Sequence, residues 1–141
     1  MRYLLLFLLL ATDCCSARSI RAWTYQEMFD EANFVFIANA RQQTDMPGAA
    51  IPDELQRMGT AIIPYKVDFE VLGVLKGHRK QNISIILYRF KEKLVPPNAP
   101  SFPSIDISQS NRYLVFLKDG RPLSGEIDPI ISFQRIDAAN P

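Results

Sequence analysis

Residues 61–75 constrain the fold more than any other segment, because they form the longest strand-like run and their apolar and polar side chains alternate at residues 65–71. The alternating side chains are those of Tyr65, Lys66, Val67, Asp68, Phe69, Glu70 and Val71. A period of two is typical of a β-strand with one buried face and one face in water. At about 3.3 Å per residue, such a strand is longer than a small domain is wide. The strand must therefore bend, and Gly73 is the expected place for a bulge.

A short helix is predicted at residues 24–32, directly before the first strand. Thr24 can cap this helix because Glu27 follows in the position that a capping box requires. Trp23 and Met28 occupy the two positions of a hydrophobic staple. Helical spacing gives the helix one apolar face, expected to pack on the core, made of Tyr25, Met28, Phe29 and Ala32.

Four further segments have the β-branched and aromatic composition of strands, namely residues 34–38, 82–90, 112–117 and 130–136. The strand at 82–90 is expected to form a hairpin with the alternating strand. One short helix and five strands, without a regular alternation of helices and strands, indicate a mainly β fold. The prediction is a small closed or partly closed antiparallel barrel with one short N-terminal helix.

Two segments are predicted to be long loops. Residues 42–60 are rich in proline, glycine, alanine and polar side chains, and a helical turn is expected at 53–58. Residues 94–104 contain Pro96, Pro97, Pro100 and Pro103, which prevent regular structure. This second loop is expected to be extended and exposed.

Residues 1–17 have the features of a cleaved secretion signal, so the protein is predicted to be exported, to the periplasm or outside the cell. Arg2 gives a positive start, and an unbroken apolar run follows at residues 4–11. This run is shorter than the roughly 20 residues that cross a bilayer, so no transmembrane segment is expected in the mature chain. Small residues end the segment, and cleavage is expected near Ala17. Residues 18–141 then form a single domain.

Cys14 and Cys15 are the only cysteines, and both lie in the predicted signal. A cut after Ala17 leaves a mature chain that needs no disulfide. A cut between Cys14 and Cys15 is the alternative, and it would make Cys15 the mature N-terminus.

The residue types present argue against catalysis, and no cofactor or metal is expected. His78 is the only histidine, so a zinc site of the usual kind cannot be assembled. The chain has neither the Gly-x-Ser-x-Gly motif of serine hydrolases nor a glycine-rich phosphate loop. Asp68 and Glu70 share one face at a separation that glycosidases use, but Lys66 lies on the same face, which favours a solvated surface. The formal net charge of +1 argues against nucleic acid as a partner.

Two surface segments are candidates for binding a partner, expected to be another exported protein or a component of the cell envelope. The first is the basic turn at residues 76–80, with Lys76, Arg79 and Lys80, whose alternative interpretation is a solvated hairpin tip. The second is the proline-rich loop, where Leu94, Val95 and Phe102 would supply apolar contact area. Alternatively, Phe102 folds back and plugs one end of the barrel.

The order of several segments resembles exported bacterial proteins of uncharacterised function that carry a domain like that of tissue inhibitors of metalloproteinases. The segments are residues 24–38, Val74-Leu75-Lys76-Gly77, Tyr113-Leu114-Val115-Phe116-Leu117 and Ser124-Gly125-Glu126-Ile127-Asp128-Pro129. The resemblance implies an OB-like five-stranded barrel with a helix before its first strand. It covers roughly residues 23–136.

The animal inhibitors that share this fold insert a mature N-terminal cysteine into the active site of a protease, where it chelates zinc. They begin with a Cys-x-Cys pattern and are held by disulfides. Cys15-Ser16-Ala17 matches the first half of that pattern and departs from it at Ala17.

Three functions follow as hypotheses. The first is an exported, non-catalytic binding module of unknown ligand. The second is a protease-inhibitor-like protein that uses Cys15 or a loop as a wedge. The third is an oligosaccharide-binding domain of the OB type, which would need exposed aromatic side chains on a strand face.

Overall fold

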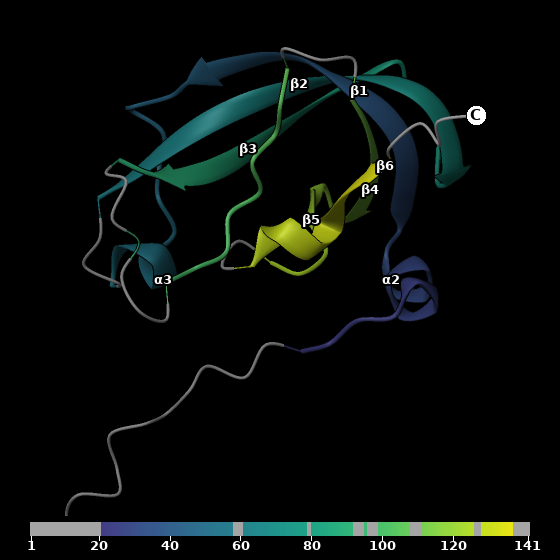
Figure 1. Cartoon of the computed structure of the whole chain (residues 1–141), viewed down its shortest axis with the longest axis horizontal. Helices are drawn as coiled ribbons and strands as arrows, with labels where there is room; N and C mark the ends of the chain where they lie inside the picture. Colours follow the sequence, from purple (N-terminus) through teal and green to yellow (C-terminus); the bar gives the residue numbers. More distant parts are fainter. Residues whose placement is uncertain are drawn as a thin grey trace, which may run out of the picture.

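The computed structural model describes residues 21–57, 61–78, 80–91, 95, 99–107, 111–125 and 128–136. The predicted signal peptide and both cysteines lie outside these residues. The helical segments are α2 (Tyr25–Glu31), α3 (Asp53–Gln56) and the 3-10 turn η1 (Pro129–Ser132). The strands are β1 (Phe34–Asp45), β2 (Ile62–Lys76), β3 (Asn82–Phe90), β4 (Arg112–Lys118), β5 (Arg121–Pro122) and β6 (Phe133–Ile136). The fold is therefore mainly β, as predicted (Figure 1).

All strand pairs of the described chain are antiparallel, and they form one sheet in the order β3-β2-β1-β4-β5. β6 also pairs with β4, along Arg112 to Val115, whereas β5 pairs with the end of β4 at Leu117 and Lys118. The two short strands therefore share the edge of β4 opposite β1. Within the described residues, β3 pairs with β2 alone, so hydrogen bonding does not close the sheet into a complete barrel.

The predicted bend of the alternating strand is found at β-bulges between β1 and β2. The register shifts where Ile37 pairs with Gly73 and Ala38 with Val71, so that Leu72 is the extra residue next to the expected glycine. A second shift leaves Leu75 unpaired. An extra residue bends its strand and increases the local twist. As a result β1 and β2 curve over β4, β5 and β6 (Figure 1).

The curved sheet encloses the main core. The predicted alternation of β2 is confirmed, since Tyr65, Val67 and Phe69 are buried and the residues between them are only half-buried. The Phe69 ring lies 6.1 Å from that of Phe133 and 6.3 Å from that of Tyr113, measured between ring centroids. These contacts join β2 to β4 and β6 across the core.

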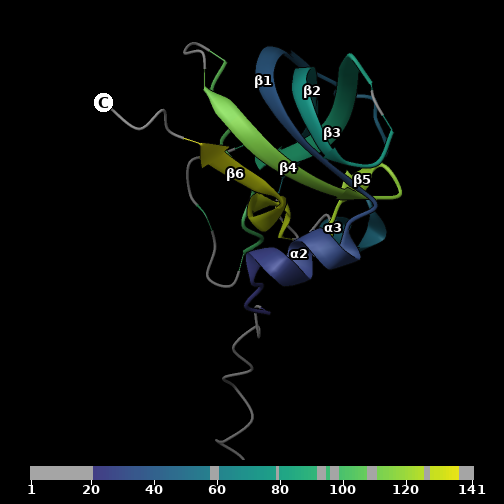
Figure 2. The same cartoon turned by 90° about the vertical axis from the view of Figure 1, so that its right-hand side faces the viewer.

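Helix α2 covers the outer face of β1 and β4 (Figure 2). The predicted capping box is present: the Thr24 hydroxyl accepts from the Glu27 N–H, and the Thr24 N–H donates to the Glu27 carboxylate. Met28 and Ala32 are buried against β1 and β4. Tyr25 was expected on the same buried face but is 61% exposed, because it sits in the first turn at the rim of the contact.

Several predicted boundaries are wrong. β1 continues to Asp45 and takes in residues 42–45 of the predicted loop, since their backbone pairs with β2 while their polar side chains stay at the surface. The predicted strand at 130–136 begins as the turn η1, because Pro129 and Asp128 favour a turn there. β5 adds a sixth strand, joined to β4 by Asp119 and Gly120, whose positive φ angles of 53° and 79° are those of a tight hairpin turn.

Candidate functional site

In the described sheet, β3 is an end strand that pairs with β2 alone, so its other edge is open. Two hydrogen bonds at the ends of the β2–β3 ladder, Val71 N–H to the Gln81 carbonyl and Lys91 N–H to the Ala61 carbonyl, fix which residues face β2. Both bonds use odd-numbered residues on the β3 side, Gln81 and Lys91. Since the direction of the backbone groups alternates along a strand, the N–H and C=O groups of odd-numbered β3 residues point at β2. The groups of Asn82, Ser84 and Ile86 point away from it. In the described part of the chain, no backbone group pairs with these three.

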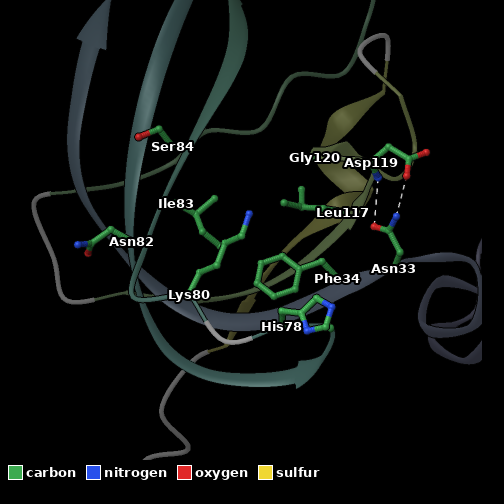
Figure 3. Close-up of a pocket in the computed structure, with 11 residues that line it drawn as sticks. Asn33, Phe34, His78, Lys80, Asn82, Ile83, Ser84, Leu117, Asp119 and Gly120 are labelled. Atoms are coloured by element: carbon green, nitrogen blue, oxygen red, sulfur yellow. Dashed lines mark hydrogen bonds between the residues drawn. The ribbon is translucent and has the colours of Figure 1, made fainter.

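A groove runs along this edge, between β3 and the β4–β5 turn. It consists of two pockets, of about 610 and 550 Å³, and both are lined by Ser84 and Gly120. The larger pocket extends from there to Phe34, His78 and Lys80, as Figure 3 shows. The smaller pocket extends toward α3 and is lined by Ile51, Pro52, Ile86, Tyr88 and Pro122. The volumes lie within the range typical of ligand sites.

The larger pocket has an apolar wall and a cation. Phe34, Ile83 and Leu117 form the wall around the Lys80 side chain (Figure 3). The Lys80 ammonium lies 6.0 Å from the centre of the Phe34 ring. No described residue forms an ion pair or hydrogen bond with it.

The one carboxylate that lines this pocket is held by another residue. Asn33 donates its side-chain N–H to Asp119 Oδ1 at 2.7 Å and accepts the Asp119 backbone N–H at 3.1 Å. These two bonds fix the turn that forms the far wall of the groove (Figure 3). Lys80 is therefore a cation without a partner of opposite charge among the described residues.

The predicted basic turn is not a simple hairpin tip. β2 runs on past the end of β3 to pair with β1, so the chain returns through a wide connection. Lys76 Nζ donates to the Phe29 carbonyl at 2.7 Å and to the Asp30 carbonyl at 3.0 Å. These are carbonyls of the last turn of α2, where a cation is stabilising. Lys76 thus secures the helix, Lys80 faces the groove, and Arg79 lies outside the described residues.

The proline-rich loop packs on the domain where the structure describes it. Pro100 and Pro103 are buried, so the prediction of an exposed segment is wrong for this part. The Tyr65 hydroxyl donates to the Pro103 carbonyl at 3.1 Å, and burial raises the pKa of Tyr65 to about 12. The Gln43 side chain donates to the Ile105 carbonyl. These two bonds hold residues 103–105 against β1 and β2.

The candidate partner-binding residues of this loop lie in different environments. Phe102 is half-buried, with its ring centroid 5.0 Å from that of Phe90 and 6.4 Å from that of Tyr88. Val95 is 61% exposed, and Leu94 lies outside the described residues. Neither Phe102 nor Val95 lines the groove along β3.

Replacing Phe102 by alanine is expected to lower the free energy of unfolding by about 1–3 kcal/mol. The loss is smaller than for a fully buried phenylalanine because Phe102 keeps part of its surface in water. Val95→Ala is the matched control in the same loop, with an expected change within about 0.5 kcal/mol. Denaturant unfolding measures both values, and equal effects of the two variants would contradict the packing of Phe102.

The carboxylates of β2 are paired on its outer face. Asp68 accepts from the Ser84 hydroxyl at 2.5 Å and lies 3.2 Å from Lys66 Nζ, and Glu70 pairs with Arg41. The Ser84 hydrogen bond lowers the pKa of Asp68 below its ordinary value. A general acid needs a raised pKa, so the lowered pKa of Asp68 does not suit that role.

Sequence reasoning missed the groove and most of the residues that line it. The available signal was the pair Asp119-Gly120 followed by Pro122, which indicates a hairpin with a strand too short to pair widely. Across the ranges that the structure describes, no cluster of three or more His, Cys, Asp or Glu residues could hold a metal ion. No protein-family model matches the sequence, and neither does any curated protein.

Proposed function

We propose that the protein is an exported, non-catalytic binding module that takes its ligand in the groove along β3. The single observation that carries this proposal is the pair of pockets joined at Ser84 and Gly120. They follow a strand edge whose backbone groups at Asn82, Ser84 and Ile86 have no partner in the described sheet. Concave sites of this size with a few polar groups are typical binding sites.

The strand connections support an OB-like barrel as the scaffold. β1 pairs with β2 and β4, β2 pairs with β3, and β4 pairs with β6. OB barrels are partly open, and their ligands bind outside the barrel core. The gap between β3 and β5 would be the open part of such a barrel.

The chemistry of the groove favours binding over catalysis. In the larger pocket the Asp119 carboxylate is held by Asn33, Asp53 lines the smaller pocket, and the carboxylates of β2 are paired outside the groove. The strands also argue against the oligosaccharide hypothesis, because none of the aromatic residues in the described strands is exposed. OB-type sites for sugars and single strands depend on exposed aromatic rings.

Export rests on the sequence at residues 1–17. In the described part of the chain, no helix has the length and apolar character needed to span a bilayer. Because the protein is proposed to be exported, an exported protein or a component of the cell envelope is the proposed class of partner.

The test compares capture of material from the exported fraction of the producing cells by the protein and two variants. Gly120→Trp adds a large side chain at a residue that lines both pockets and has open space around a Cβ, and Thr44→Trp adds the same side chain to an exposed position on β1 outside both pockets. The protein and Thr44→Trp should capture a specific ligand equally well, and Gly120→Trp should reduce its capture at least tenfold. Equal capture by all three would overturn the proposed site.

Intact-mass analysis of the exported protein should show loss of the first 17 residues, and a mass that includes Met1 would contradict cleaved export.

A further inference from the structure

We propose that the edge of β3 binds an extended polypeptide segment as an additional strand, with an acidic residue of that segment beside Lys80. This inference rests on the proposed function and names the class of ligand. An edge strand presents a row of unpaired N–H and C=O groups, and an extended peptide satisfies them all at once. On β3 these groups belong to Asn82, Ser84 and Ile86.

The chain's own neighbouring strand is poorly suited to this edge. β5 consists of two residues only. The hydrogen bond from Leu123 N–H to the Phe116 carbonyl sets the pairing of this hairpin, so the nitrogen of Pro122 points away from β4, toward the groove. Proline has no N–H, so this side of β5 offers no donor at Pro122. One wall of the groove, β3, therefore presents unpaired backbone N–H and C=O groups, whereas the opposite wall, β5, is too short and lacks the donor at Pro122 to pair with them.

The side chains along the groove fit an extended peptide better than a sugar or a small polar molecule. Ile86 is 44% exposed, and it lines the smaller pocket with Ile51 and Pro52. Phe34 and Leu117 line the larger pocket. Every second side chain of an added strand points to the same side, so two pockets with partly apolar walls along one edge can each take a residue of the peptide.

The positive charge of Lys80 is expected to favour an acidic residue at one end of the peptide. The Lys80 ammonium lies within the larger pocket, over the Phe34 ring, and the nearby Asp119 carboxylate is already bonded to Asn33. A carboxylate from the ligand would give Lys80 the partner that the described residues do not supply. Rim charges of this kind act chiefly on the choice of partner and on the association rate.

The experiment selects random peptides displayed on phage against the exported chain and measures the binding of one enriched peptide as a synthetic molecule. We expect enriched sequences of alternating apolar residues with an acidic residue near one end. Amide hydrogen exchange of the complex should slow at Ser84 and Ile86, whose N–H groups point to the groove. Exchange at Ile85 and Leu87 should change little, because their amides already face β2.

Matched substitutions separate backbone pairing from simple burial. Ser84→Pro removes the outward N–H, whereas Ser84→Ala removes the hydroxyl bond to Asp68 and keeps that N–H. Ser84→Pro should weaken peptide binding at least tenfold, and Ser84→Ala should stay within about threefold of the protein. Lys80→Gln should weaken it several-fold and reduce its dependence on salt.

The exchange experiment uses the unsubstituted protein, so the inference stays testable if Ser84→Pro does not fold. Failure to enrich any peptide would overturn the inference, as would exchange protection that does not include Ser84 and Ile86, or equal binding by Ser84→Pro and Ser84→Ala. If a glycan array instead gives a ligand whose binding Gly120→Trp abolishes, the polypeptide inference is wrong and the proposed binding function stands.

Discussion

Replacing Phe69 by alanine is expected to lower the free energy of unfolding by about 3–5 kcal/mol, as for other fully buried phenylalanines. Phe69 is 1% exposed, and its ring contacts those of Tyr113 and Phe133. These contacts cross the core from β2 to β4 and β6. Because no described hydrogen bonds join β3 to β5 or β6, side-chain packing must hold the two ends of the sheet around one core. A loss of this size approaches the whole stability of a typical small domain, which is roughly 5–15 kcal/mol.

Denaturant unfolding followed by circular dichroism measures the effect. Phe116→Ala should cost a similar amount, about 3–5 kcal/mol, because Phe116 is 2% exposed beneath α2. Leu72→Ala is the control, since Leu72 is a bulged residue that is 48% exposed, and it should change the free energy by about 0.5 kcal/mol or less. A loss below about 1 kcal/mol at both phenylalanines would show that the phasing of β2 and β4 is wrong.

Local patterns of the sequence were sufficient to predict the elements that carry this core. The alternation around Phe69 identified the buried face of β2, and Thr24 with Glu27 marked the start of α2. The end of β1 was missed because residues 42–45 are polar on both sides, and only their pairing with β2 makes them a strand. Strand propensity is weak where backbone pairing, and not burial, supplies the stability.

The groove could not be predicted in the same way, because it depends on which strand edges meet. Ser84 and Gly120 are distant in sequence and come together only when the sheet curves around its core. The role of Lys76 is tertiary too, since this residue of β2 bonds to carbonyls of α2. A run of basic residues predicts a charged surface, but it does not say which cation is used inside the fold and which one faces a ligand.

Gly77→Ala is expected to destabilise the protein by about 2–4 kcal/mol, from strain and a steric clash together. Gly77 has a φ of 94°, a backbone conformation that residues with a Cβ rarely adopt. A Cβ at this position would also lie 2.6 Å from Phe34 Cδ2 and 2.8 Å from the Asn33 carbonyl oxygen. The Asn33 backbone cannot move easily, because its N–H donates to the Leu117 carbonyl and its side chain holds Asp119.

Two other glycines separate the causes of the Gly77 effect. Gly120 has a φ of 79° but open space around a Cβ, so Gly120→Ala should cost only the strain, about 1–2 kcal/mol. Gly73 has open space and no positive φ, so Gly73→Ala should be neutral or stabilise the protein by about 0.4–1 kcal/mol. Thermal and denaturant unfolding of the three variants should therefore rank Gly77→Ala lowest in stability and Gly73→Ala highest. Equal stabilities of Gly77→Ala and Gly120→Ala would mean that Phe34 and the Asn33 carbonyl both move aside without cost. The close approach of residues 76–80 to Phe34, which places Lys80 in the groove, would then not depend on the glycine.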